Sequence, residues 1–243
     1  MNNKIEKIIF LDIDGVLNTS RSKLLNENQK INNIYIEKGI HAAIAEGYLF
    51  SFDPLGVNLI NKICEETNSK IVISSSWRRL IKHDKLLSHL ISQGIKSEYL
   101  HEKEPICSFR FSSEKIHDIL EWIYSFKEDY PNKELSYLIF DDDRIDYLNT
   151  FDNINQYQIL IDSNDGINYS NYLSSILFFN NTYKNKDVSK LTEEIKVKYP
   201  KNFLSIFNFL CKKEKVISEI ERYINFNTHD DILEIISKNQ FNL

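Results

Sequence analysis

The stretch that decides the fold is Ile8-Ile9-Phe10-Leu11-Asp12-Ile13-Asp14-Gly15-Val16-Leu17, near the start of the 243-residue chain. Its first four residues form a continuous apolar run that includes β-branched side chains. Such a run is typical of a strand buried on both faces of a parallel sheet. The run ends abruptly in two carboxylates, Asp12 and Asp14. We therefore expect a central strand whose carboxyl end carries acidic groups.

Two later apolar runs have the same form and also end in polar residues. Lys70-Ile71-Val72-Ile73 leads into three serines, and Tyr137-Leu138-Ile139-Phe140 leads into three aspartates. A fourth candidate strand covers 157–161, and helical spacing of apolar residues fills the intervals 54–67, 82–93 and 114–126. Strands that alternate with helices predict an α/β fold, namely a doubly wound, Rossmann-like parallel sheet with helices on both faces. In such sheets ligands bind beyond the carboxyl ends of the strands.

The chain divides into a sheet domain and a helical end. Residues 1–183 are expected to form the sheet domain, with 18–52 as a small insert between the first two strands. This insert is polar and Asn-rich, with a weak helical pattern only near 41–46. It is long enough for a small lid over the site but too short for a globular cap. Residues 184–243 show apolar stripes at helical spacing, which predict a C-terminal helical appendage.

Charge and cysteine content restrict the partners and the compartment. The net charge is −5, from 35 acidic and 30 basic residues. An acidic chain is poorly suited to coat an extended nucleic acid, a task that needs clustered positive charge. Three widely spaced cysteines (Cys64, Cys107 and Cys211) indicate reduced thiols. With neither a signal peptide nor a membrane span in the sequence, we expect a cytoplasmic protein. An effector exported without a cleavable signal would share these features.

Carboxylates after two strands indicate a metal site. Asp12 and Asp14 follow the first strand at positions i and i+2, so they point to one side if the strand geometry persists. Asp141 and Asp142 follow another buried strand. Adjacent parallel strands would bring these groups to one edge, where like charges need a cation or a proton between them. Hard oxygen ligands of this kind are suited to Mg²⁺.

A hydroxyl and a cation are available at the same edge. Ser74 ends the strand 70–73 and could donate to a phosphoryl oxygen, although Ser75 is an alternative. Lys115, in the first turn of a predicted helix, could supply positive charge, although Arg110 is close enough in sequence to compete.

These parts, in this order, resemble the haloacid dehalogenase (HAD) superfamily. More narrowly, the sequence resembles the HAD domains of "Swiss Army knife" RNA-repair proteins. The similarity spans about residues 5–170. Its narrower motifs are Asp14-Gly15-Val16-Leu17-Asn18, Phe52-Asp53-Pro54, Ser74-Ser75-Ser76-Trp77-Arg78, Asp118-Ile119-Leu120-Glu121-Trp122-Ile123 and Asp162…Asp165-Gly166-Ile167.

The resemblance implies a Mg²⁺-dependent phosphomonoester hydrolase that acts through an aspartyl-phosphate. Asp12 would be the nucleophile. Asp14 would protonate the leaving oxygen and later deprotonate the hydrolytic water. Mg²⁺ would be held by Asp12, Asp141 and the backbone carbonyl of Asp14, and Asp142 would order a metal-bound water.

The remaining candidates concern the phosphate and the rest of the substrate. Ser74 and Lys115 would hold the non-bridging phosphate oxygens. Trp77 could stack on a base or could instead pack in the core. Arg78 could grip a second phosphate through two hydrogen bonds. The other expected substrate-binding residues are Gly15, Asn18 and Ser75.

Several substrates and two other functions remain open at this stage. The RNA-repair resemblance favours a nucleotide or a nucleic-acid end phosphate, while a phosphoprotein or a small phosphorylated metabolite would suit the same chemistry. A metal-dependent glycosyltransferase could use Asp12 and Asp14 on a sugar nucleotide, but it would leave Ser74, Lys115 and Asp141 without a role. A non-catalytic interaction protein of this fold is the third possibility, against which the intact Asp12 and Asp14 argue.

Overall fold

The computed structural model describes residues 5–108, 115–145 and 157–180. Its elements, in chain order, are β1 (Ile5–Leu11), α1 (Asn26–Lys38), α2 (Ile40–Glu46), α3 (Pro54–Thr67), β2 (Lys70–Ile73), α4 (His83–Ser92), α5 (Lys115–Asp129), β3 (Glu134–Asp141), β4 (Gln158–Leu160) and α6 (Tyr169–Phe179). Short 3-10 helices cover Ser22–Leu24 (η1), Ser76–Arg79 (η2) and Ser97–Tyr99 (η3).

Within the described residues the strands form one parallel sheet in the order β2-β1-β3-β4. Leu11, the last residue of β1, is in register with Ile73 of β2 and with Phe140 of β3. The three strands therefore end at the same level, so the residues that follow them meet at one edge. This confirms the α/β fold with a parallel sheet and helices on both faces.

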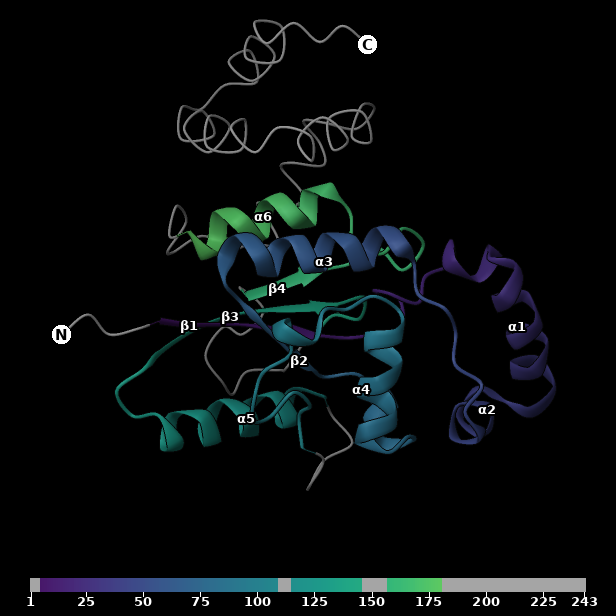
Figure 1. Cartoon of the computed structure of the whole chain (residues 1–243), viewed down its shortest axis with the longest axis horizontal. Coiled ribbons are helices and arrows are strands. Elements are labelled where there is room, and N and C mark those ends of the chain that lie inside the picture. Colours follow the sequence, from purple (N-terminus) through teal and green to yellow (C-terminus); the bar gives the residue numbers. More distant parts are fainter. Residues whose placement is uncertain (1–4, 109–114, 146–156, 181–243) are drawn as a thin grey trace, which may run out of the picture.

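The alternating side chains of β1 define two packed layers. Ile9 and Leu11 face a large core that α3 and α6 complete, and these two helices pack against each other. Ile8 and Phe10 face the opposite side, where Trp122 of α5 meets Phe10 edge-on with ring centroids 5.4 Å apart. In Figure 1, α3 and α6 accordingly lie on one side of the sheet and α5 on the other. Burial on both faces explains the continuous apolar run.

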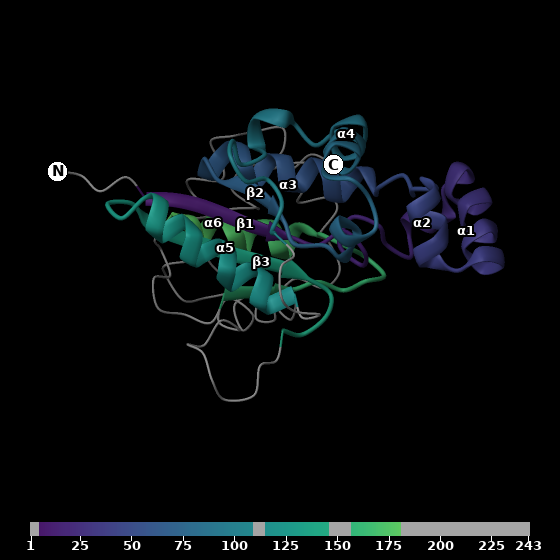
Figure 2. The same ribbon diagram turned by 90° about the horizontal axis from the view of Figure 1, so that it is seen from below.

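The insert between β1 and α3 lies beyond the carboxyl ends of the strands. In Figures 1 and 2, α1 and α2 project together from that end of the sheet. Helix α1 was not expected from the sequence, because most of its residues are polar and only Asn28 and Tyr35 are buried. Its position depends on tertiary contacts rather than on an apolar stripe, since the ring of Tyr35 packs at a tilt against Phe50 with ring centroids 4.5 Å apart.

Hydrogen bonds hold both ends of the insert to the sheet domain. The side chain of Arg21 donates to Asp53, the N-cap of α3, and to the backbone carbonyl of Asp165. Within the insert, Asn28 donates to the carbonyls of Ser22 and Ser51 at 2.8 and 2.7 Å and so joins its two ends to α1. These contacts fix where α1 stands relative to the strand ends.

Some expectations fall outside the described residues. They are the helical region 184–243, Cys211 and Arg110. Cys64 and Cys107 are buried free thiols. In the part of the chain that the structure describes, no helix combines the length and the apolar character needed to cross a membrane.

Candidate active site

Three carboxylates meet where β1 and β3 end. Asp12 directly follows β1, Asp141 is the last residue of β3, and Asp142 comes next. The backbone N–H of Asp12 donates to the carbonyl of Phe140 at 3.0 Å, which joins the two strand ends. Carboxylate oxygens of Asp12, Asp141 and Asp142 lie within 4.8 Å of one another. The structure thus brings together the side chains that the strand pattern places at one edge.

The carboxylate cluster holds more negative charge than its surroundings neutralise. Burial, followed by repulsion from Asp12, raises the pKa of Asp141. The same two causes raise the pKa of Asp142 to about 6. A divalent cation would reverse this by favouring the charged forms. The donor set and its charge therefore fit Mg²⁺.

Among the described residues, Lys115 is the cation that pairs with this cluster. It begins α5, and its Nζ lies 2.5 Å from Oδ2 of Asp12 and 2.5 Å from Oδ2 of Asp141. Burial alone would lower the pKa of Lys115, but the two carboxylates raise it overall. Lys115 therefore stays charged beside Asp12, where a phosphate would need positive charge.

Asp14 faces away from the cluster and is held by two donors. Its Oδ1 accepts a hydrogen bond from Nδ2 of Asn18 at 2.6 Å, and its Oδ2 accepts one from Nε1 of Trp77 at 2.8 Å. Burial raises the pKa of Asp14, and the two hydrogen bonds oppose this. The two hydrogen bonds thus fix the Asp14 side chain in a direction different from that of the three clustered carboxylates.

Gly15 allows the acidic loops to approach closely. It adopts φ 71°, and a Cβ at this position would lie 2.1 Å from the carboxyl carbon of Asp142. Any other residue would push Asp142 away from the strand ends. Gly15 therefore acts mainly through the space it leaves, although it also lines the adjacent pocket.

Ser74 and Ser75 follow β2 but have different surroundings. The backbone N–H of Ser74 donates to the carbonyl of Leu11, which places the residue beside Asp12. Its Oγ is buried and has no hydrogen-bond partner among the described residues. The Oγ of Ser75 instead accepts from the backbone N–H of Trp77 and caps η2. An unpaired buried hydroxyl is unfavourable unless a ligand completes it, so Ser74 is better placed than Ser75 to bind phosphate.

The expected contacts of Trp77 and Arg78 with the substrate are corrected by the structure. Trp77 is 0% exposed and packs near Phe52 and His89, so its ring cannot stack on a base. The side chain of Arg78 is buried against Asp118 of α5 and also donates to the carbonyls that follow β2. Both side chains point into the protein because they lie on the buried face of η2. No local pattern in the sequence specifies which face of this short helix is buried.

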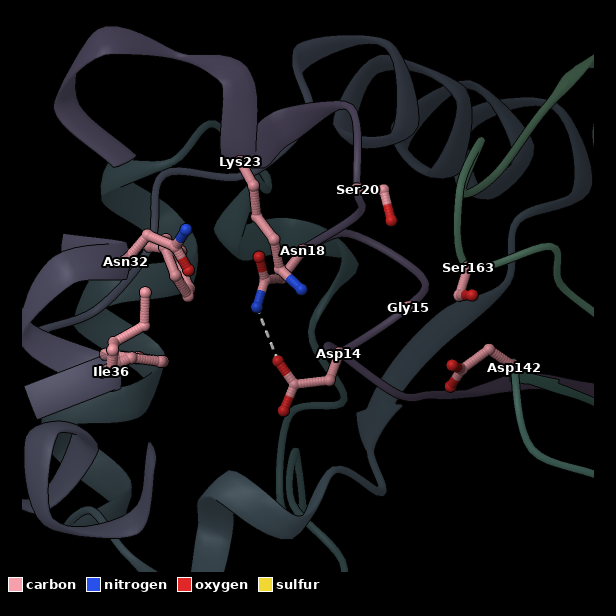
Figure 3. Close-up of a pocket in the computed structure, with 11 residues that line it drawn as sticks. Asp14, Gly15, Asn18, Ser20, Lys23, Asn32, Ile36, Asp142 and Ser163 are labelled. Atoms are coloured by element: carbon pink, nitrogen blue, oxygen red, sulfur yellow. Dashed lines mark hydrogen bonds between the residues drawn. The ribbon is translucent and has the colours of Figure 1, made fainter. Parts of the chain in front are cut away.

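A pocket opens between the Asp14 turn and the insert. Its volume is about 490 Å³. Asn32 and Ile36 project into it from α1, and the side chain of Lys23 extends toward Asn18 (Figure 3). Asp142 lies on the side of the pocket opposite α1. The other lining residues are Asp14, Gly15, Ser20, Tyr35, Phe50 and Ser163. The sequence revealed no part for Lys23 or Asn32 here, because α1 carries too few apolar residues to be predicted.

Comparison with known proteins identifies the family. Residues 8–171 match the model of the HAD domain in Swiss Army Knife RNA repair proteins. Because this match covers more than half of the chain, the protein belongs to that family, which is part of a superfamily of phosphatases and other hydrolases. HAD proteins generally depend on Mg²⁺, and Asp12, Asp141 and Asp142 could hold such an ion. Neither a curated protein nor a solved structure matches the chain.

Proposed function

We propose that the protein is a Mg²⁺-dependent phosphomonoester hydrolase that acts through an aspartyl-phosphate on the terminal phosphate of a nucleotide or nucleic acid. The observation that carries this proposal is the ion pair between the Asp12 carboxylate and Lys115 at the strand end that Ser74, whose buried Oγ has no partner among the described residues, also adjoins through its backbone. The family description, which concerns RNA repair proteins, supports a nucleotide substrate.

Each side chain has a chemical duty in this reaction. Asp12 would attack phosphorus while the bond to the leaving oxygen breaks. Asp14 would give a proton to that oxygen and later take one from the water that hydrolyses the acyl phosphate. Ser74 and Lys115 would bind the non-bridging phosphate oxygens and stabilise the negative charge on them in the transition state.

Asp12, Asp141 and Asp142 would hold Mg²⁺, with the backbone carbonyl of Asp14. The ion would neutralise charge between carboxylate and phosphate, which otherwise repel each other. Activity should therefore disappear on chelation and return when Mg²⁺ is added. Activity that persists after complete chelation would contradict this part of the proposal.

Replacement of the nucleophile provides the main test. Asp12→Asn should lower hydrolysis of p-nitrophenyl phosphate by at least about 10⁴-fold, because the amide cannot form the covalent intermediate. Asp143→Asn is the matched control, since Asp143 is exposed and outside the carboxylate cluster. Reduction of the acyl phosphate with borohydride, followed by peptide mass spectrometry, should place the modification on residue 12. Full activity in Asp12→Asn, with an unchanged circular dichroism spectrum, would overturn the assignment.

We also propose a reducing, cytoplasmic location. Cys64 and Cys107 support it as buried free thiols, and burial raises the pKa of Cys64 to about 12. Such thiols are inert parts of the core.

A further inference from the structure

The pocket beside Asp14 lies where a leaving group would extend. Asp14, Gly15 and Asp142 belong both to its wall and to the edge of the sheet where the carboxylates meet, whereas Asp12 does not line it. A phosphate bound next to Asp12 would therefore place its leaving oxygen near Asp14 and the rest of the substrate in the pocket. This step rests on the proposed function.

Lys23 is the basic residue that lines this pocket in the described part of the chain. The other basic side chains at the base and end of α1 are occupied, since Arg21 pairs with Asp53 and Lys38 pairs with Glu46. Among the ion pairs of the described residues, Lys23 has none. Its ammonium group lines the pocket together with the carboxylates of Asp14 and Asp142 and attracts Asp14. Within this lining, Lys23 is therefore the group that would attract an anionic part of a ligand.

The remaining lining suits a nucleoside. The pocket has the usual volume of a small-molecule site. The side chains of Asn32, Ser20 and Ser163 can bond sugar hydroxyls, and Ile36, which is 76% exposed, offers an apolar edge to a base. Asn18 Oδ1 is buried without a partner among the described residues, so a donor from the ligand would satisfy it.

We propose that this pocket binds a nucleoside that carries a second phosphate, and that Lys23 contacts that second phosphate. The hydrolysed phosphate lies at the carboxylate edge, and the second one lies at the mouth near the insert. One lysine can pair with one additional phosphate. The site therefore binds either the terminal nucleotide of a nucleic acid or a nucleoside bisphosphate. A long stretch of backbone would need more cations.

The test compares two substrates that differ only in the second phosphate. Phosphate release from adenosine 3′,5′-bisphosphate is measured beside release from adenosine 3′- and 5′-monophosphate. The unmodified protein should prefer the bisphosphate about 10-fold in kcat/KM, the size expected of one charge-assisted contact. Lys23→Gln should remove most of this preference. In the unmodified protein the preference should also shrink as ionic strength rises, because salt screens the contact.

Lys30→Gln is the matched control. Lys30 is an exposed residue of α1 that does not line the pocket, and its replacement changes the net charge equally. The preference for the bisphosphate should remain in this variant. Equal loss of preference in Lys30→Gln and Lys23→Gln would overturn the contact in favour of general attraction by the insert.

The outcomes separate this inference from the proposed function. If p-nitrophenyl phosphate is hydrolysed but the unmodified protein treats bisphosphate and monophosphates alike, the second-phosphate site is overturned and the hydrolase stands. If a phosphoserine peptide is hydrolysed better than every nucleotide, the pocket belongs to a protein substrate and the inference fails. If the protein, loaded with Mg²⁺, releases phosphate from none of these compounds, the proposed function fails and takes the inference with it.

Discussion

The two sides of the central strand β1 differ in whether their buried charges are paired. On the β3 side, carboxylate oxygens of Asp12, Asp141 and Asp142 lie within 4.8 Å of one another, and Lys115 contacts Asp12 and Asp141. On the β2 side, the charge is buried in a matched pair, because Asp118 of α5 accepts hydrogen bonds from Arg78. The first side is left with negative charge that lacks a partner, whereas on the second side the buried carboxylate of Asp118 is paired with Arg78 and Arg79.

This difference separates a binding edge from a supporting one. Buried charge is tolerated only when it is paired and hydrogen-bonded, so the opposite charges of Arg78 and Asp118 need no further ion. Crowded carboxylates with raised pKa values, as at Asp141 and Asp142, indicate that a cation completes them. Function should therefore concentrate on the β3 side and stability on the β2 side.

The largest effect on stability should come from breaking the buried pair. In Arg78→Met, the ion-pair partner that remains for buried Asp118 among the described residues is Arg79, at 3.2 Å. The loss should be about 3–5 kcal/mol in the free energy of unfolding, the usual result of removing one partner of a buried pair. Urea denaturation followed by circular dichroism would measure it.

An exposed ion pair provides the control for that change. Lys133 and Glu6 lie 3.1 Å apart with partly exposed side chains, and Lys133→Met should cost less than about 1 kcal/mol. The double variant Arg78→Met/Asp118→Leu should recover part of the stability that Arg78→Met loses. Equal, small losses in Arg78→Met and Lys133→Met would remove the distinction between the two sides of β1.

The two serines after β2 give the next largest effect, because Ser74 lies beside the strand end that leads into Asp12, whereas Ser75 caps η2. Ser74→Ala should lower kcat/KM by about 10²-fold, as loss of one phosphate donor does, without lowering stability. Ser75→Ala should instead cost about 1 kcal/mol of stability, since its Oγ caps η2. Kinetics and thermal melting of both variants would measure this crossed pattern. The reverse pattern would assign the phosphate contact to Ser75.

The sequence predicted the β3 side better than the β2 side, for a physical reason. Asp12 and Asp141 are placed by strand geometry alone, because parallel strands in register must end together. Trp77 and Arg78 lie past the strand in a short 3-10 helix, whose direction depends on packing against residues 40 positions away, such as Asp118. Helix α1 was not predicted because it is mostly polar and is positioned by a few contacts with residues distant in the sequence.

Trp77 connects the two sides, because its indole reaches Asp14 from the buried core. Trp77→Phe keeps an aromatic ring but removes the donor to Asp14. If Asp14 protonates the leaving oxygen, the loss should be about 10-fold for an alkyl phosphate, whose alkoxide must be protonated as it leaves. With p-nitrophenyl phosphate, whose leaving group needs no proton, the loss should be much smaller.

The ratio of the rates for the alkyl phosphate and p-nitrophenyl phosphate distinguishes a loss of Asp14 positioning from a general disturbance of the fold. Trp122→Phe is the control, because Trp122 also loses an indole hydrogen bond, to the carbonyl of Glu104, but lies away from Asp14. Its two rates should change by the same factor. A Trp77→Phe variant that slows both substrates equally would show that the indole acts only through the fold.

The smallest effect should come from a neutral group on the β2 side. The backbone of His101 bonds Ile71 of β2, and its Nδ1 accepts a hydrogen bond from the backbone N–H of Glu104 at 3.1 Å. Burial lowers the pKa of His101 below its ordinary value. Above about pH 6.5, His101 is neutral in both the folded and unfolded states, so its stabilising effect is complete. As the pH falls through the folded pKa, the unfolded chain binds the proton first, and stability is lost.

His101→Asn should therefore flatten the pH dependence of the free energy of unfolding between pH 7 and pH 5, since its Oδ1 can accept the same hydrogen bond without titrating. The change should be a fraction of the loss in Arg78→Met. Denaturation at a series of pH values would compare the two curves. Groups with raised pKa values, such as Asp142, shift both curves alike, so only the difference between them reports on His101. Parallel curves would mean that His101 is solvated well enough to protonate in the folded protein. The β2 side would then carry an unpaired charge, the protonated imidazole of His101, just as the β3 side carries unpaired carboxylates.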